Sequence, residues 1–97
     1  MKKLNELKNY RKIDARFVHP NNTRGARICI EEKKRYNDCT VKRKYFSCGD
    51  KPLQEQAFDI LTKNGFNVIC LTSNAESYGF LCDNWAENYI EISDIKA

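Results

Sequence analysis

One segment of the sequence has the clear period of an amphipathic helix, and it separates two regions that have the patterns of strands. The apolar residues that share one face of this helix are Leu53, Ala57, Ile60 and Leu61. We expect the helix to span residues 50–64, with Asp50 as its N-cap and Pro52 tolerated in its first turn. Asn64 and Gly65 should end it, with Gly65 in the left-handed conformation.

Residues 13–48, which precede the helix, predict a three-stranded antiparallel meander. Polar and apolar residues alternate in 14–18, and residues 21–25 have the composition of a turn. Residues 26–32 and 40–47 supply the second and third strands. Short connections favour antiparallel neighbours, so the three strands are expected to pair in chain order.

Residues 66–92, which follow the helix, predict a second hairpin. The first strand, 66–72, is apolar on both faces, which is typical of a central strand covered on both sides. Its partner is expected at 77–83, and residues 89–92 form a last short edge strand.

The whole chain of 97 residues is therefore expected to be one α+β domain. Its sheet has about five antiparallel strands and one main amphipathic helix, in the order (α)-β-β-β-α-β-β-(β). The bracketed first element is residues 1–12, for which a short docked helix and a mobile basic arm both remain open.

The distribution of apolar residues bears on whether the protein is expected in the cytoplasm, in a membrane or outside the cell. No apolar run approaches the ~20 residues that a membrane-spanning helix needs. The basic N-terminus has no apolar segment of the secretion-signal kind. We therefore expect a cytoplasmic protein with no membrane partner.

The cysteines agree with a reducing compartment. Five are present, at Cys29, Cys39, Cys48, Cys70 and Cys82, and none forms a Cys-x-x-Cys motif. Free thiols are the simplest interpretation, with Cys70 and Cys82 as small core residues. A Cys39–Cys48 disulfide and a zinc site that uses His19 are weaker alternatives.

The sequence does not contain the motifs of a catalytic site. Neither a nucleophile elbow, a zinc-protease helix nor a Walker loop occurs. His19 is the single histidine, and Glu31 and Glu32 should point to opposite faces of a strand. We expect no enzyme activity, no catalytic residues, no metal, no cofactor and no small-molecule substrate.

Charge is divided unevenly along the chain. Residues 1–51 hold fifteen Lys and Arg against six Asp and Glu, a net charge of +9. Residues 52–97 hold two against seven, a net charge of −5. Such a division indicates a basic surface that attracts phosphates or an acidic protein.

The cations of the meander and its loops, with an interleaved aromatic ring, form the predicted binding set. Its members are Arg16, Arg24, Arg27, Lys33, Lys34, Arg35, Tyr36, Lys42, Arg43 and Lys44. A solvated basic face is the alternative, and Arg24 and Arg27 could instead pair with Asp14, Glu31 or turn carbonyls. Trp85 is expected to cap the core or to anchor a partner protein.

The run Arg16-Phe17-x-x-Pro20-x-Asn22-Thr23-Arg24-Gly25-x-Arg27-Ile28 resembles the opening of a family of short, mostly uncharacterised accessory proteins from phages, plasmids and other mobile elements. The resemblance implies a stoichiometric binding protein that acts against host machinery, of the anti-defence, anti-restriction or anti-CRISPR type. The expected partner is then a host protein or nucleoprotein complex, reached through the basic face. Direct binding of DNA or RNA by the meander is the alternative.

Overall fold

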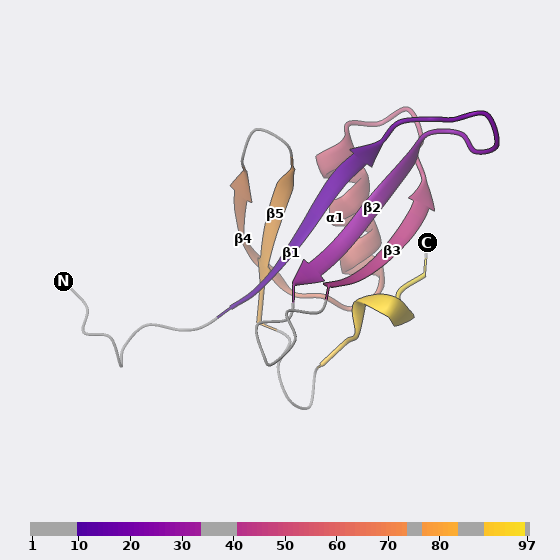
Figure 1. The fold of residues 1–97 in the computed structure, drawn as a ribbon. Coiled ribbons are helices and arrows are strands. Elements are labelled where there is room, and N and C mark those ends of the chain that lie inside the picture. The colour runs from indigo at the N-terminus through magenta and orange to yellow at the C-terminus, as the bar shows by residue number, and fades with distance from the viewer. Residues whose placement is uncertain (1–9, 34–40, 74–76, 84–88, 97) are drawn as a thin grey trace.

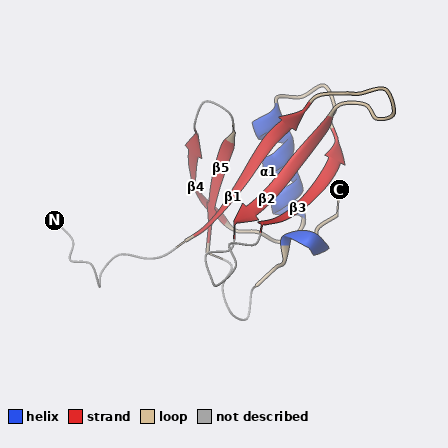
Figure 2. Cartoon of the chain, in the orientation of Figure 1, coloured by secondary structure: helices blue, strands red, loops and turns tan. Residues whose placement is uncertain are grey.

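The fold is an α+β domain with one antiparallel sheet, as the sequence predicts. The structure, a computed structural model, describes residues 10–33, 41–73, 77–83 and 89–96. Its elements are β1 (Arg11–Val18), β2 (Arg27–Lys33), β3 (Val41–Ser47), α1 (Leu53–Lys63), β4 (Val68–Ser73), β5 (Tyr78–Cys82) and the 3-10 helix η3 (Ile92–Asp94). The five strands lie in the order β3-β2-β1-β5-β4 (Figures 1 and 2).

β1 is the central strand, because it pairs with β2 on one side and with β5 on the other. The predicted meander β1-β2-β3 is present, with Phe17 opposite Ile28 and Ile28 opposite Phe46. The prediction that residues 66–72 form a central strand is wrong. β4 pairs only with β5 and lies at the edge of the sheet, although its sequence is apolar on both faces.

The core lies between one face of the sheet and the layer formed by α1 and η3 (Figure 2). Strand alternation sends Ile13, Ala15, Ile28, Ile30, Phe46, Phe80 and Cys82 into this layer. Ala57 and Leu61 of α1 meet them, and Ile92 and Ile95 cover the part next to β3. No helix of the described residues lies on the other face of the sheet (Figure 1).

The C-terminal end of α1 forms as predicted, but its N-terminal end does not. Gly65 has a φ of 96°, the Gly65 amide donates to Thr62 O, and the Phe66 amide donates to Leu61 O. This is the Schellman arrangement, in which buried Phe66 supplies the apolar contact. The N-cap is Pro52 rather than Asp50, with no side-chain cap, so the helix begins three residues later than predicted.

The predicted last strand at 89–92 is also wrong, because η3 occupies its end. At the other terminus, residues 1–9 lie outside the described residues, whereas Arg11 and Lys12 belong to β1 rather than to a helix or an arm. None of the helices in the described residues has the length and apolar character needed to cross a membrane.

A buried ion pair ties the start of β1 to the end of β2. Arg11 donates from Nε and Nη2 to the two carboxylate oxygens of Glu32, at 3.0 and 2.8 Å, and also to the Ile90 carbonyl at 2.7 Å. Its guanidinium lies over the rings of Phe66 and Tyr89. Burial opposes the charge of Arg11, but the hydrogen bonds and charge of Glu32 outweigh it and raise the Arg11 pKa.

Candidate binding surface on the open face of the sheet

The face of the sheet that α1 leaves uncovered is charged. Register places five cations on it, Lys12 and Arg16 from β1, Arg27 and Lys33 from β2, and Arg43 from β3. Asp14, Glu31 and the exposed ring of Tyr45 share this face. We call these eight residues the basic face; its five cations outnumber its two carboxylates.

Glu31 bridges two arginines at the centre of the basic face. Arg16 Nε lies 3.5 Å from one carboxylate oxygen of Glu31, and Arg43 Nε lies 3.2 Å from the other. Burial opposes the charge of the Arg16 guanidinium, but Cys29 and Glu31 outweigh it and raise the Arg16 pKa. The charges of the two arginines are thereby partly neutralised, so this carboxylate limits the attraction of the face for anions.

Arg27 stacks on Tyr45 across the strand pair. Its guanidinium carbon lies 4.8 Å from the centre of the Tyr45 ring, which is a cation–π contact. The Arg27 Nε is buried without a hydrogen-bond acceptor among the described residues. The cation–π contact holds the guanidinium over the Tyr45 ring, while its buried Nε–H has no acceptor in the part of the chain that the structure describes. The alternative that Arg27 serves in a structural ion pair gains no support from the described contacts.

A thiol lies beneath this layer. Cys29 is opposite both Arg16 and Tyr45 and is fully buried, although alternation directs it toward the open face. Burial and the neighbouring Glu31 raise the pKa of the Cys29 thiol. A protonated, covered thiol of this kind packs as a small apolar residue and is a poor nucleophile.

Asp14 of the basic face is poorly satisfied. One of its carboxylate oxygens, Oδ1, is buried without a hydrogen bond, and the nearest cation, Lys12 Nζ, lies 3.8 Å from it. Burial raises the Asp14 pKa; Lys12 counteracts this shift, whereas Glu31 adds to it. Asp14 and Glu31 lie directly opposite each other in the β1–β2 pair, and such like charges repel.

The connection between β1 and β2, which includes Arg24, extends beyond the end of the sheet (Figure 1). The Asn21 side chain accepts hydrogen bonds from the amides of Thr23 and Arg24, and the Asn21 amide donates to Arg24 O. The turn is therefore held by Asn21 and by the backbone of Arg24, whose side chain is exposed. Gly25 contributes less than the sequence indicates, because its φ is not positive.

The predicted binding residues do not all share one surface. Arg16, Arg27, Lys33 and Arg43 belong to the basic face, whereas Lys42 and Lys44 project from β3 toward the helix side of the sheet. Lys42 lies opposite Glu32, and Lys44 lies opposite Ile30. Lys34, Arg35 and Tyr36, together with Cys39 and Trp85, lie outside the described residues.

Four members of the basic face are not in the predicted set: Lys12, Asp14, Glu31 and Tyr45. Had the first strand been extended back to Arg11, alternation would have placed Lys12 beside Asp14 and Arg16. The bridging role of Glu31 carries no local sequence signal, because it depends on the register of three strands.

The thiols differ in exposure more than predicted. Cys82 is buried, as expected, but Cys70 is exposed on β4, and the prediction of a core residue there is wrong. Cys48 is a free thiol in the structure. Within the described ranges, no group of three His, Cys, Asp or Glu side chains is placed to hold a metal ion.

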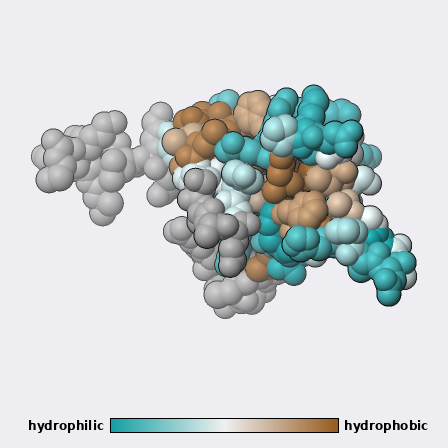
Figure 3. Space-filling view, turned by 90° about the horizontal axis from the view of Figure 1, so that it is seen from above, coloured by the Kyte–Doolittle hydropathy of each residue, from teal (hydrophilic) through white to brown (hydrophobic). Residues whose placement is uncertain are grey.

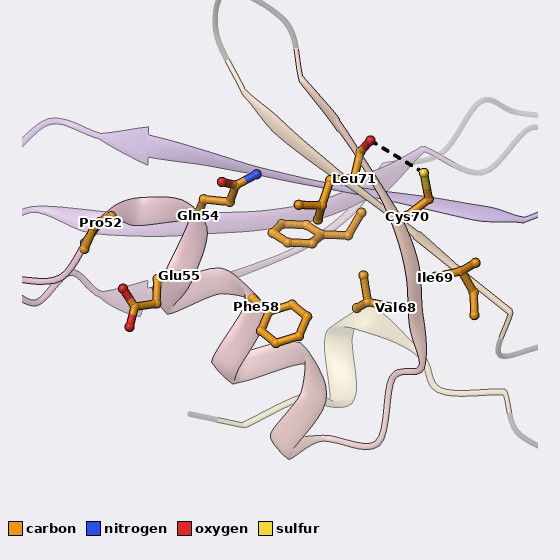
Figure 4. Close-up of a pocket in the computed structure, with 9 residues that line it drawn as sticks. Pro52, Gln54, Glu55, Phe58, Val68, Ile69, Cys70 and Leu71 are labelled. Atoms are coloured by element: carbon orange, nitrogen blue, oxygen red, sulfur yellow. Dashed lines mark hydrogen bonds between the residues drawn. The ribbon is translucent and has the colours of Figure 1, made fainter.

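A second surface feature lies on the other side of the molecule, between α1 and β4. It is an open groove of about 560 Å³ whose apolar walls include Phe58, Val68, Leu71 and Phe80 (Figure 4). Phe58 and Phe80 contact each other at its floor, with ring centres 6.5 Å apart. Apolar groups on the surface of the molecule are brown in Figure 3.

Comparison with known proteins gives no match to a protein-family model, to a curated protein or to a solved structure.

Proposed function

We propose that this protein is a non-enzymatic binding protein that modulates a nucleic-acid-processing complex of its host, and that the basic face is its contact surface. The observation that carries the proposal is the uncovered sheet face on which Lys12, Arg16, Arg27, Lys33 and Arg43 gather. On an ordinary solvated surface the two signs of charge are interspersed, whereas the basic face holds five cations and only two carboxylates. Phosphates or a cluster of acidic side chains are the groups that such a surface attracts.

The resemblance of residues 16–28 to accessory proteins of mobile elements supports the host target. A protein of this size that acts stoichiometrically needs one surface that contacts its target. The natural ligand of a nuclease or nucleoprotein complex is nucleic acid, and arginines mimic neither its charge nor its shape. The basic face is therefore expected to cover a phosphate-bearing or acidic part of the complex rather than to replace nucleic acid within it.

Affinity capture from host lysate tests this proposal. The wild-type protein should recover a nuclease or nucleoprotein complex, and the triple variant Arg16→Ala, Arg27→Ala, Arg43→Ala should lose it. Lys51→Ala is the matched control, because it removes a cation beside α1 and leaves the basic face intact. Recovery of the same complex by the triple variant, or of no such complex by the wild type, contradicts the proposal.

A second candidate function, direct binding of single-stranded nucleic acid, is favoured by Tyr45. An exposed ring on the sheet, with an arginine stacked on it, offers a platform for a base while neighbouring cations contact phosphates. Fluorescence anisotropy with labelled DNA and RNA oligonucleotides tests it. Affinity should fall steeply with salt, and Arg27→Ala should reduce the salt slope by about one. Equal affinity at low and high salt argues against this function.

A further inference from the structure

The two edges of the sheet differ in chemistry. β3, at one edge, carries three consecutive cations, Lys42, Arg43 and Lys44, all exposed. Charged side chains of this kind protect an edge strand from pairing with another chain. β4, at the other edge, carries no charged residue between Val68 and Ser73. Only one edge of the sheet is therefore protected by charge.

The uncharged edge is also apolar, and its register with β5 shifts between Val68 and Cys70, so the regular part of the strand is residues 70–73. Ile69 is 47% exposed and Leu71 is 53% exposed, the two largest fractions among the exposed apolar side chains of the described residues. Leu71 and Val68 line the groove beside Phe58, while Ile69 points away from it (Figure 4). A strand that is apolar on both faces is typical of the interior of a sheet. β4 thus has the sequence of an interior strand at an edge position.

We propose that β4 pairs antiparallel with β4 of a second copy of this chain, which makes a symmetric dimer with one continuous sheet. A strand that pairs with its own copy must not carry several charges of one sign, because a two-fold axis places each residue near a copy of itself or of a close neighbour, and like charges would repel. β4 meets this condition because it has no charge to repel its copy. The β3 edge does not meet it, because its cations would face one another.

The geometry of the pairing fixes which faces share a side. Two antiparallel strands of one sheet are related by a two-fold axis perpendicular to that sheet. Both copies of α1 then lie on one side, and both basic faces lie on the other. Leu71 and Phe58 of the two copies border a shared apolar surface on the helix side. If the basic face binds as proposed above, the dimer presents two such faces to one partner; this consequence alone rests on the proposed function.

The size of the contact sets the expected strength. One edge strand and part of a groove bury less area than the ~1,200–2,000 Å² of a standard stable interface. The dimer is therefore expected to dissociate on dilution rather than to be permanent. Self-association should consequently appear as a mass that depends on protein concentration.

Sedimentation equilibrium, or light scattering coupled to size exclusion, measures this directly. Over a range from about 5 to about 500 µM, the mass should rise from 11.4 kDa toward twice that value. Leu71→Lys places a cation on the edge and should weaken the dimer at least tenfold, while circular dichroism stays unchanged because the side chain is exposed. Phe17→Lys is the control: Phe17 is 40% exposed on β1, away from β4, and its replacement should leave the dimer intact.

Cross-linking identifies the strand that forms the contact. Cys70 is exposed near the middle of β4, so antiparallel pairing brings the two Cys70 thiols close together. In a chain with Cys39→Ser and Cys48→Ser, a short bismaleimide should join two wild-type β4 strands and should fail to join chains that carry Leu71→Lys.

A constant mass of 11.4 kDa across this concentration range overturns the proposal. So does a dimer that Leu71→Lys leaves unchanged or that Phe17→Lys disrupts equally. Docking of an extended peptide from another protein on β4 would appear as a monomer alone and a complex with that protein, which also contradicts self-pairing. None of these readouts depends on the basic face, so failure of the dimer and failure of the proposed function are distinguishable.

Discussion

Replacing Glu31 with glutamine should strengthen the binding of anions by the basic face. Glu31 lies between Arg16 and Arg43 and holds both guanidinium groups at 3.5 and 3.2 Å. The substitution keeps the shape of the side chain and removes its charge. Misfolding of the variant would weaken binding, so it cannot explain an increase in affinity.

The expected size follows from the geometry. A phosphate that sits on the face about 7 Å from Glu31 is repelled by about 0.6 kcal/mol at the dielectric constant of water. Each exposed ion pair that must loosen to release an arginine contributes roughly 0.2–1 kcal/mol. The sum is about 1 kcal/mol or slightly more, which is about a fivefold gain in affinity. Salt screens these exposed charges, so the gain should shrink near physiological ionic strength.

Fluorescence anisotropy with a labelled oligonucleotide, or with heparin as a simple polyanion, measures the change. The matched control is Glu55→Gln, which alters the net charge by the same amount on the exposed side of α1. Glu31→Gln should bind about five times more tightly than the wild type, and Glu55→Gln should bind about as the wild type does.

Stability should change little in the Glu31→Gln variant. The fold loses two exposed ion pairs but also loses the repulsion between Glu31 and Asp14, which lie opposite each other. We expect a change in the free energy of unfolding within about 1 kcal/mol. Equal gains for Glu31→Gln and Glu55→Gln would show that net charge alone matters. Weaker binding by a folded Glu31→Gln variant would refute the view that Glu31 neutralises the face.

Three further predictions concern stability and reactivity. Replacing Glu32 alone with alanine should lower the free energy of unfolding, measured in urea, by about 3–5 kcal/mol, because the charge of Arg11 stays buried without its partner. The double variant Arg11→Met, Glu32→Leu should lose far less stability, because it removes both charges. A double variant that loses as much as the two single variants together would contradict this. Asp14→Asn should be more stable than the wild type at neutral pH. Burial raises the Asp14 pKa above 3.8, so the wild type loses stability as the pH rises through that pKa, and the gap between the two proteins should close in acid. Iodoacetamide should modify exposed Cys70 in the folded protein at pH 8 and spare Cys82, whose pKa burial raises to about 11; mass spectrometry that finds both modified at similar rates would exclude this order.

Much of the local structure follows from short-range patterns in the sequence. The Schellman end of α1 is encoded by Asn64, Gly65 and Phe66, since only these residues and the last helical turn take part in it. Alternation likewise places Arg27 with Glu31 on one face of β2 and Arg43 with Tyr45 on one face of β3, because strand geometry turns successive side chains to opposite faces. No knowledge of the neighbouring strand is needed for either result.

The start of α1 shows where local signals compete. Asp50 has the chemistry of an N-cap, yet the helix begins after Pro52, and the Gln56 side chain instead accepts from the Gly49 amide at 2.7 Å. The burial of Arg11 carries no local signal either. It depends on Glu32, twenty-one residues away, and on Phe66 and Tyr89.

Strand order is what the tertiary structure decided, and it changes the interpretation of the molecule most. Residues 66–72 are indeed apolar on both faces. This pattern predicts that both faces are covered, but it does not predict which strands pair with this one. Pairing of β1 with β5 placed β4 at the edge with Ile69 and Leu71 exposed. The sequence by itself determined one helix, alternating strands and a cationic first half. Long-range pairing alone decided that arginines from β1 and β3 meet at Glu31 of β2 and that an apolar edge remains open.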